Sequence, residues 1–179
     1  MRIAREFESA SEGGSGGAWL TGDGPDGDIV ISSRARLARN LRGHRFLLRA
    51  DPGERRAIEA ELREALSRVE FPDEMTYLDL EGAEQLDAEL LVERHLISRE
   101  LAKGDGPRAA CFSPREDVSI MVCEEDHLRL QVLRSGFQLT DAWETVDRLD
   151  DRVSAQVGYA VSERYGYLTC CPPNVGPGL

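Results

Sequence analysis

The stretch VSIMVCEEDHLRLQVL, residues 118–133, decides the fold. Apolar side chains alternate with period two before and after an acidic centre. The alternating positions are Val118, Ile120 and Val122, then Leu128, Leu130 and Val132. Side chains two positions apart share one face of a strand, so the pattern predicts two antiparallel strands that meet at residues 124–127. Residues 109–112 predict a third strand just before them.

Helical periodicity predicts one helix before these strands and one after them. The first follows Asp51, which can cap it, and ends at Phe71-Pro72. Its apolar stripe is Ile58, Leu62, Ala65, Leu66 and Val69. The later helix is capped by Thr140. Its apolar face is Trp143, Val146, Leu149, Val153 and Val157.

Shorter elements occupy the remaining chain. A helix from Asp87 carries His95 on the same face as Leu91, and Ser98 caps a further turn that stops at Gly104. Apolar, β-branched and aromatic residues predict strands at 29–31, 76–80 and 165–169. Helices and strands are interleaved without a strict strand–helix–strand repeat. The sequence therefore predicts an α+β fold with a largely antiparallel sheet flanked by helices.

Composition narrows the class of protein. The chain has 179 residues, 41% of them hydrophobic and 31% charged, which is typical of one globular domain. Residues 1–18 are polar and end in glycine and serine, so we expect a flexible arm before a folded region at 19–179. No apolar run approaches the ~18 residues of a membrane span, and no secretory signal is visible. A cytoplasmic protein without a membrane partner is expected.

Charge and cysteine content add two further expectations. The formal net charge of −11 argues against nucleic-acid binding. The four cysteines include no CxxC pair, and the three histidines are too few to complete a zinc site with them. Reduced thiols are therefore expected.

Arginines gather in one segment despite the acidic total. Six of them lie between Ile29 and Ala50, where there is no acidic residue. Hydroxyl and guanidinium groups in the run 32–40 suit forked hydrogen bonds to phosphate oxygens. A solvated basic face that pairs with the acidic remainder is the favoured alternative on charge pattern alone, and nucleic-acid contact is a third.

The run Glu124-Glu125-Asp126-His127 places three acids and an imidazole at the turn between two strands. Such a cluster is costly unless it shares a cation, a metal or a proton. Because successive side chains point in opposite directions, one glutamate can enter a pocket while its neighbour faces a metal-bound water or solvent. A polar hairpin tip is the favoured interpretation from the residues alone, and a metal cage is a further alternative, although nearby ligands and a standard ligand spacing are lacking.

Two other candidates are open to more than one interpretation. Cys170 and Cys171 precede a rigid loop rich in proline and glycine, where backbone amides or arginines can lower a thiol pKa. Two small buried cysteines before a loop are the commoner case. His95 on a helix face is usually a packed or capping histidine.

Four segments, taken in order, resemble the ATP:guanidino phosphotransferases, the family of creatine and arginine kinases. They are ISSRARLARNL (31–41), LLVERHLIS (90–98), VSIMVCEEDHLRLQ (118–131) and YGYLTCCPPNVGPGL (165–179). The cysteine-proline-x-asparagine-x-glycine run is the most specific of them. The short N-terminal region is similar to the bacterial protein arginine kinase branch. Cys123, Pro173 and Pro177 depart from the family pattern, which has asparagine, a hydroxyl residue and threonine at these positions.

The resemblance implies ATP and Mg²⁺ as cofactors and assigns roles to particular residues. Glu125 would hold the substrate guanidinium and help to remove its proton, and Glu124 would support Mg²⁺ through water. Cys171 would be the reactive thiol beside the guanidinium. The positions implied to contact the nucleotide are Ser32, Ser33, Arg34, Ala35, Arg36, His95 and Arg129.

The resemblance also implies an activity and its partners. The expected reaction transfers the ATP γ-phosphoryl group to arginine side chains of proteins, with activator or chaperone–protease partners as in the family. Residues 19–179 are expected to form the first part of the catalytic domain, because the family continues with a further arginine segment and a second carboxylate loop. Low activity of this chain alone is expected for the same reason. The alternative is a noncatalytic regulatory or binding remnant of a guanidino kinase.

Overall fold

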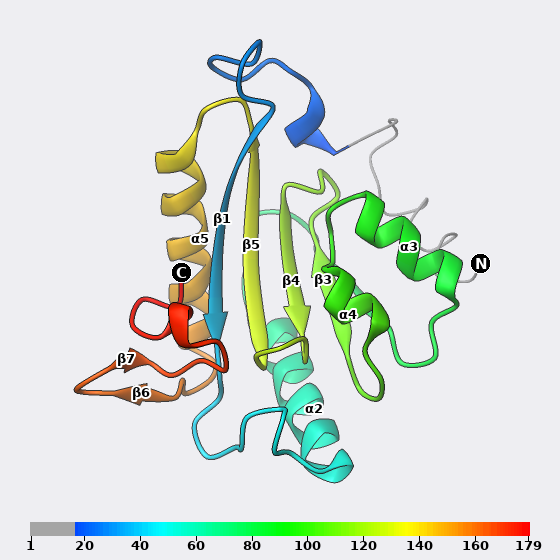
Figure 1. Ribbon diagram of the computed structural model, residues 1–179, viewed down its shortest axis with the longest axis vertical. Coiled ribbons are helices and arrows are strands. Elements are labelled where there is room, and N and C mark those ends of the chain that lie inside the picture. Colours follow the sequence, from blue (N-terminus) through cyan, green and yellow to red (C-terminus); the bar gives the residue numbers. More distant parts are fainter. Residues whose placement is uncertain (1–16) are drawn as a thin grey trace.

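A five-stranded antiparallel sheet forms the centre of the computed structural model, which describes residues 17–179 (Figure 1). The strand order is β1-β5-β4-β3-β2. The period-two alternation of apolar residues forms β4 and β5, as predicted, and β1 joins their edge from far earlier in the chain. The strands are β1 (Ser32–Arg39), β2 (Thr76–Asp79), β3 (Ala109–Phe112), β4 (Val118–Val122) and β5 (Leu128–Ser135).

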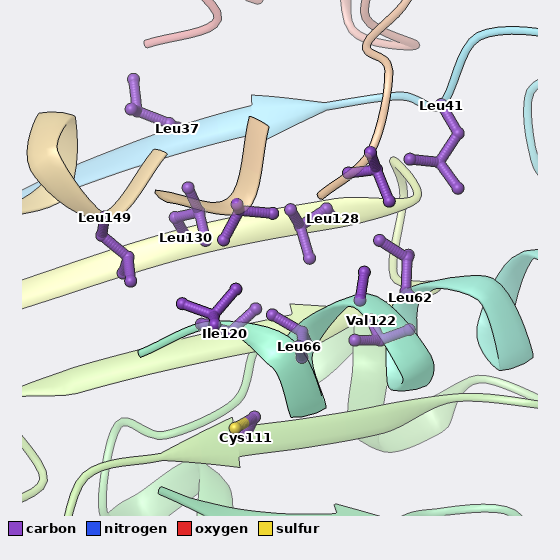
Figure 2. Packing of buried hydrophobic residues seen from close by; sticks show 14 of the residues in the cluster. Leu37, Leu41, Leu62, Leu66, Cys111, Ile120, Val122, Leu128, Leu130 and Leu149 are labelled. Carbon is purple, nitrogen blue, oxygen red and sulfur yellow. The ribbon is translucent and has the colours of Figure 1, made fainter. Parts of the chain in front are cut away.

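The register of these strands gives the sheet two unlike faces. Leu37 lies opposite Leu130, which in turn lies opposite Ile120. These three side chains share the apolar face and are fully buried in the main core (Figure 2). One position along β1, Arg36 lies opposite Gln131 and points to the other face. The second face therefore carries Arg34 and Arg36 of β1 and Arg129 and Gln131 of β5.

Two long helices cover the apolar face. In α2 (Pro52–Arg68) the carboxylate of Asp51 accepts a hydrogen bond from the backbone N–H of Glu54 at 3.0 Å, so the predicted cap is confirmed. In α5 (Leu139–Ser154) the buried stripe packs against β1 and β5. The main core includes Ile58, Leu62 and Leu66 of α2 and Val146, Leu149 and Val153 of α5.

Two short helices cover only half of the other face. They are α3 (Gln85–Glu93) and α4 (Arg99–Lys103), which Ser98 caps through a 3.0 Å bond from the N–H of Leu101. Their apolar residues form a second core with β2, β3 and β4. In Figure 1 α3 and α4 lie in front of this half, and β1 and β5 are not covered by an α-helix there; the short turn at Ala18–Leu20 contacts β5. The second core contains Leu78, Leu91, Leu96, Leu101, Phe112 and Met121.

The C-terminal segment folds back onto the end of β1. It contains the two-stranded ribbon β6 (Val161–Ser162) and β7 (Gly166–Tyr167) and the short turn η2 (Pro172–Asn174). The buried guanidinium of Arg39 binds Asp150 at 2.6 Å, donates to the carbonyl of Pro177 at 2.9 Å and lies 3.6 Å from the ring centre of Tyr167. One arginine thus ties β1 to both α5 and the C-terminal loop.

Gly178 shows how closely this loop approaches the strand. Its carbonyl accepts a 2.7 Å bond from the N–H of Ala38, and its φ is +75°. A Cβ at this position would lie 2.1 Å from Nη1 of Arg39. Only glycine fits there without displacing the arginine.

Several predicted boundaries were wrong. Residues 29–31 are not a strand, because the ladder with β5 ends at Ser135 and the N–H groups of Ile29 and Val30 bond to the carbonyl of Asp26 in a turn instead. The strand predicted at 165–169 is limited to Gly166–Tyr167. The first helix ends at Arg68, before Phe71-Pro72, and residues 1–16 of the predicted arm lie outside the described residues.

The start of α5 also differs from its prediction. Thr140 is not the cap, because the helix begins one residue earlier at Leu139 and Gln138 precedes it without a side-chain cap. Trp143 is 39% exposed. It is one residue, or about 100° of helical turn, away from the buried stripe that includes Ala142 and Val146.

We expect the Arg39–Asp150 pair to be essential for stability. Asp150→Ala leaves a buried guanidinium without its carboxylate and should lower the free energy of unfolding by about 3–5 kcal/mol. The double change Arg39→Met with Asp150→Leu should recover much of that loss, since it removes both charges together. Urea titration measures both values. A loss below about 1 kcal/mol in the single variant would contradict the prediction.

Candidate active site

Three guanidinium groups gather on the half of the sheet that α3 and α4 leave uncovered. Arg34 and Arg36 are exposed on β1, and Ser32 shares their face. Arg129 projects to the same side from β5, where it lies opposite Ala38. Partial burial and the positive charges of Arg34 and Arg129 lower the pKa of Arg36. Such mutual repulsion makes the site favourable for an anion with several negative oxygens.

Ser33 and Ala35 point to the opposite side of the sheet. The buried hydroxyl of Ser33 donates to the carbonyl of Gly136 and accepts from the N–H of Gln138, each at 2.8 Å. Ser33 therefore holds residues 136–138, the segment that leads from β5 into α5. The structure brings Ser32, Arg34 and Arg36 together but leaves the side chain of Ser33 apart from them, and Ala35 lies in the core.

The glutamates of the β4–β5 turn lie beside this arginine face and differ in exposure. The Glu124 side chain is wholly buried, and its two oxygens lie 3.0 and 2.9 Å from Nη1 of Arg129. The Glu125 side chain is 44% exposed, with one oxygen 3.3 Å from Nη2 of the same arginine. Glu124 thus orients Arg129, while Glu125 can still reach a ligand in solvent.

A buried polar network holds the turn from behind. Asp126 Oδ1 accepts from the side-chain amide of Asn40 at 2.6 Å and from the N–H of Cys170 at 2.7 Å. The N–H of His127 donates to Asn40 Oδ1 at 3.0 Å. These bonds join the end of β1, the glutamate turn and the cysteine segment into one unit. Asn40 was missed by sequence reasoning, although an amide next to a run of arginines and close to a strand end is a usable signal.

His127 belongs to the same network and is neutral. Burial lowers its pKa. Its Nδ1 accepts a 3.0 Å hydrogen bond from the backbone N–H of Leu41. The other nitrogen, Nε2, therefore carries the proton and donates to the carbonyl of Arg45 at 3.0 Å. His127 is thus a structural residue that fixes the exit from β1.

The four cysteines are free thiols and differ in environment. Burial raises the pKa of Cys111 and of Cys123 to about 12. Burial and the charge of Asp126 raise that of Cys170 to about 12 as well. Cys171 is half-buried at the start of η2, next in the chain to the Cys170 amide that Asp126 binds. The network therefore places Cys171 on the same side of the molecule as the glutamate turn.

His95 does not lie on the helix face with Leu91. Helix α3 ends at Glu93, and His95 follows in a turn with φ +60°, where its side chain is exposed. Its carbonyl accepts a 2.8 Å bond from the side chain of Gln131, which lies opposite Arg36 in the sheet. The structure thus places His95 beside the face that carries Arg34, Arg36 and Arg129. Helical spacing did not predict this position, because His95 lies beyond the end of the helix.

The acidic residues of this site do not form a metal cage. Within residues 17–179, no three histidine, cysteine, aspartate or glutamate side chains gather as a ligand set. Mg²⁺ usually takes one or two carboxylates and keeps water and phosphate oxygens as its other ligands. The donor set is therefore compatible with an ion brought in on a phosphate chain.

No helix among the described residues has the length and apolar character needed to cross a bilayer.

The chain belongs to the ATP:guanido phosphotransferase family, whose C-terminal catalytic domain matches residues 57–179. It is 46% identical over 165 residues to a protein-arginine kinase of Symbiobacterium thermophilum and 42% identical over 161 residues to that of Halothermothrix orenii. In both cases the alignment covers 90% of this chain and 46% of the relative. The chain therefore spans about half the length of the curated relatives that it matches.

Solved structures confirm the fold. A duplicated taurocyamine kinase from Schistosoma mansoni superposes with a TM-score of 0.78 at 24% identity, over 90% of this chain and 24% of that one. Lombricine kinase gives a TM-score of 0.76 at 23% identity, over 98% of this chain and 56% of that one. The predicted α+β class with a largely antiparallel sheet is confirmed.

One of the departures named above, Cys123, lies at a left-handed backbone position. Cys123 has φ +57°, a region that suits asparagine far better than other residues with a side chain. Its N–H donates to the carbonyl of His127 at 2.9 Å, which closes the glutamate turn. The turn is closed here with a buried thiol at the position where the resemblance implies asparagine.

Cys171 should be the first thiol to react. The raised pKa values keep Cys111, Cys123 and Cys170 protonated far above neutral pH, where thiols are poor nucleophiles. Iodoacetamide at about pH 7.5, followed by mass spectrometry of peptides, should locate most of the early adduct on Cys171. Cys171→Ser should remove it, and Cys170→Ser serves as the matched control. Earlier reaction of Cys111 or Cys123 would contradict this assignment.

Proposed function

We propose that this chain binds ATP through the arginine face, that is Arg34, Arg36 and Arg129, and takes part in transfer of the γ-phosphoryl group to arginine side chains of proteins. The observation that carries the proposal is the convergence of three guanidinium groups beside one exposed glutamate. The phosphate chain meets the positive charges, and the arginine to be phosphorylated meets Glu125. The phosphoryl donor, ATP, and the phosphoryl acceptor, the substrate arginine, would thus meet where the arginine face adjoins Glu125.

The chemistry requires both kinds of group. A guanidinium has a pKa above 12, so its nitrogen becomes a nucleophile only when a carboxylate aligns it and accepts a proton. That nitrogen forms a bond to the γ-phosphorus while the bond from the γ-phosphorus to the bridging oxygen breaks and ADP leaves. The proton passes to Glu125, and the arginines neutralise the charge on the transferred group.

The other site residues have supporting roles. When bound with the nucleotide, Mg²⁺ supplies further neutralisation of the phosphate oxygens. Glu124, buried against Arg129, would hold that arginine in place and contribute negative charge to waters of the ion. Cys171 would lie beside the substrate guanidinium, held there through the amide of Cys170.

The names of the relatives support arginine in proteins as the acceptor. Because the chain covers about half of their length, activity, substrate and partners of the whole protein are part of this proposal. It includes residues 19–179 as catalytic-domain sequence, a cytoplasmic location, and activator or chaperone–protease partners.

The arginine face should be necessary for nucleotide binding. We expect Arg34→Ala with Arg36→Ala to weaken ADP binding at least tenfold, since charge-assisted hydrogen bonds to phosphate are lost. The control is Arg42→Ala with Arg49→Ala, which removes the same charge from exposed positions outside the cluster. Calorimetric titration with MgADP compares the variants. Equal binding by both double variants would show that the cluster is only a solvated basic surface.

Glu125 should be necessary for transfer but not for nucleotide binding. We expect Glu125→Gln to lower the rate of phosphoarginine formation on an unfolded protein about a hundredfold or more, because proton removal fails. The affinity for ADP should change less than twofold. Mass spectrometry under neutral conditions measures the acid-labile product. Because low activity of this chain alone is already expected, the comparison uses a chain of the relatives' full length; normal nucleotide binding by that chain without any phosphoarginine would support a regulatory role instead.

A further inference from the structure

The backbone of His95 turns into the left-handed region directly after the end of α3. Its φ of +60° is the conformation that helices commonly use at the residue after their cap. The N–H of His95 donates to the carbonyl of Val92 at 3.0 Å, and its own carbonyl accepts from Gln131 at 2.8 Å. The N–H of Leu96 also donates to the carbonyl of Leu91 at 3.0 Å, so local bonds end the helix, and the bond from Gln131 ties this helix end to the sheet.

Gln131 connects His95 to the arginine face. It is 3% exposed at the centre of β5, opposite Arg36 on one side and Ser119 on the other. Its side-chain nitrogen also lies 3.1 Å from Ser119 Oγ, so the amide cannot rotate without losing a buried bond. One side chain therefore fixes the distance between the turn that carries His95 and the strand that carries Arg36.

Trp19 packs against His95 from the N-terminal segment. The indole is buried, and its ring centre lies 4.8 Å from that of the imidazole with the planes tilted by 59°. The segment η1 (Ala18–Leu20) is itself tied down by a 2.9 Å bond from the N–H of Ala18 to the carbonyl of Arg115. The imidazole is thus held by packing at its ring and by a hydrogen bond at its backbone.

We propose that Gln131 and Trp19 are positioning residues of the nucleotide site, which hold the His95 ring where it meets the base while the arginines hold the phosphates. The inference rests on the proposed function for the existence of that site. In this proposal, different residues hold the base and the phosphate chain of the nucleotide. Gln131 and Trp19 act on the base through His95, and neither touches the phosphate chain.

The test compares two probes, ADP and inorganic tripolyphosphate, each with Mg²⁺. Gln131→Met keeps the length of the side chain and removes the donor, so it should raise the dissociation constant of ADP about five- to tenfold. The dissociation constant of tripolyphosphate should change less than twofold. Equal weakening of both probes, or no change in either, would overturn the proposal.

A double variant tests whether Gln131 acts through His95. Once His95→Ala has removed the ring, adding Gln131→Met should change ADP affinity less than twofold. Losses that multiply would mean that Gln131 acts directly or through the whole sheet, and would overturn the proposal. If Gln131→Met does not fold, Trp19→Leu tests the same claim from the other side of the ring, with the same expected split between probes.

A measurement without ligand separates this inference from the proposed function. Hydrogen exchange should accelerate at residues 94–97 in Gln131→Met while β4 keeps its protection. Unchanged exchange at residues 94–97 would refute the positioning role even if ADP binds. Absence of binding of both probes to the unchanged protein would refute the proposed function and the nucleotide part of this inference, and the exchange result would still decide whether Gln131 holds His95.

Discussion

The antiparallel register between β1 and β5 is the constraint on which the site depends. It places Arg36 opposite Gln131 and Ala38 opposite Arg129, so that arginines from strands far apart in the sequence share one face. Because side chains alternate along a strand, a slip of one residue would turn Arg34 and Arg36 into the apolar core and expose Leu37. The two leucines at 37 and 130, buried against α2 and α5, therefore also fix the position of the charged site.

The cost of gathering like charges is offset close by. The buried carboxylate of Glu124 neutralises Arg129, and the network of Asp126, Asn40 and His127 holds the turn from which Glu124 projects. A preorganised set of charges requires little rearrangement when a ligand arrives. The same network reaches the backbone of Cys170, so the glutamates and the thiol segment form one rigid border beside the arginine face.

Local patterns in the sequence were sufficient for much of the fold. Alternation predicted β4 and β5, and the caps at Asp51 and Ser98 were confirmed because each depends only on neighbouring residues. The ends of β1 depended on a partner strand about a hundred residues away, so residues 29–31 were misassigned. The Trp143 side chain was misplaced because the true stripe begins one residue earlier.

The candidate site was accessible from the sequence only in part. Arg34 and Arg36 were correctly placed on one face by simple alternation. The engagement of the Ser33 hydroxyl at the start of α5 depends on a tertiary contact, and so does the position of His95, which follows the helix in a left-handed turn bound to Gln131. The ion pair of Glu124 with Arg129 requires the closed turn that only the folded chain supplies.

A crystal structure of the protein with MgADP tests the central claim most directly. The account predicts phosphate oxygens within about 2.7–3.2 Å of at least two of the guanidinium groups of Arg34, Arg36 and Arg129, over the half of the sheet that α3 and α4 leave uncovered. Phosphates bound instead on the α5 side of the sheet, near Arg134 and Arg148, would contradict it.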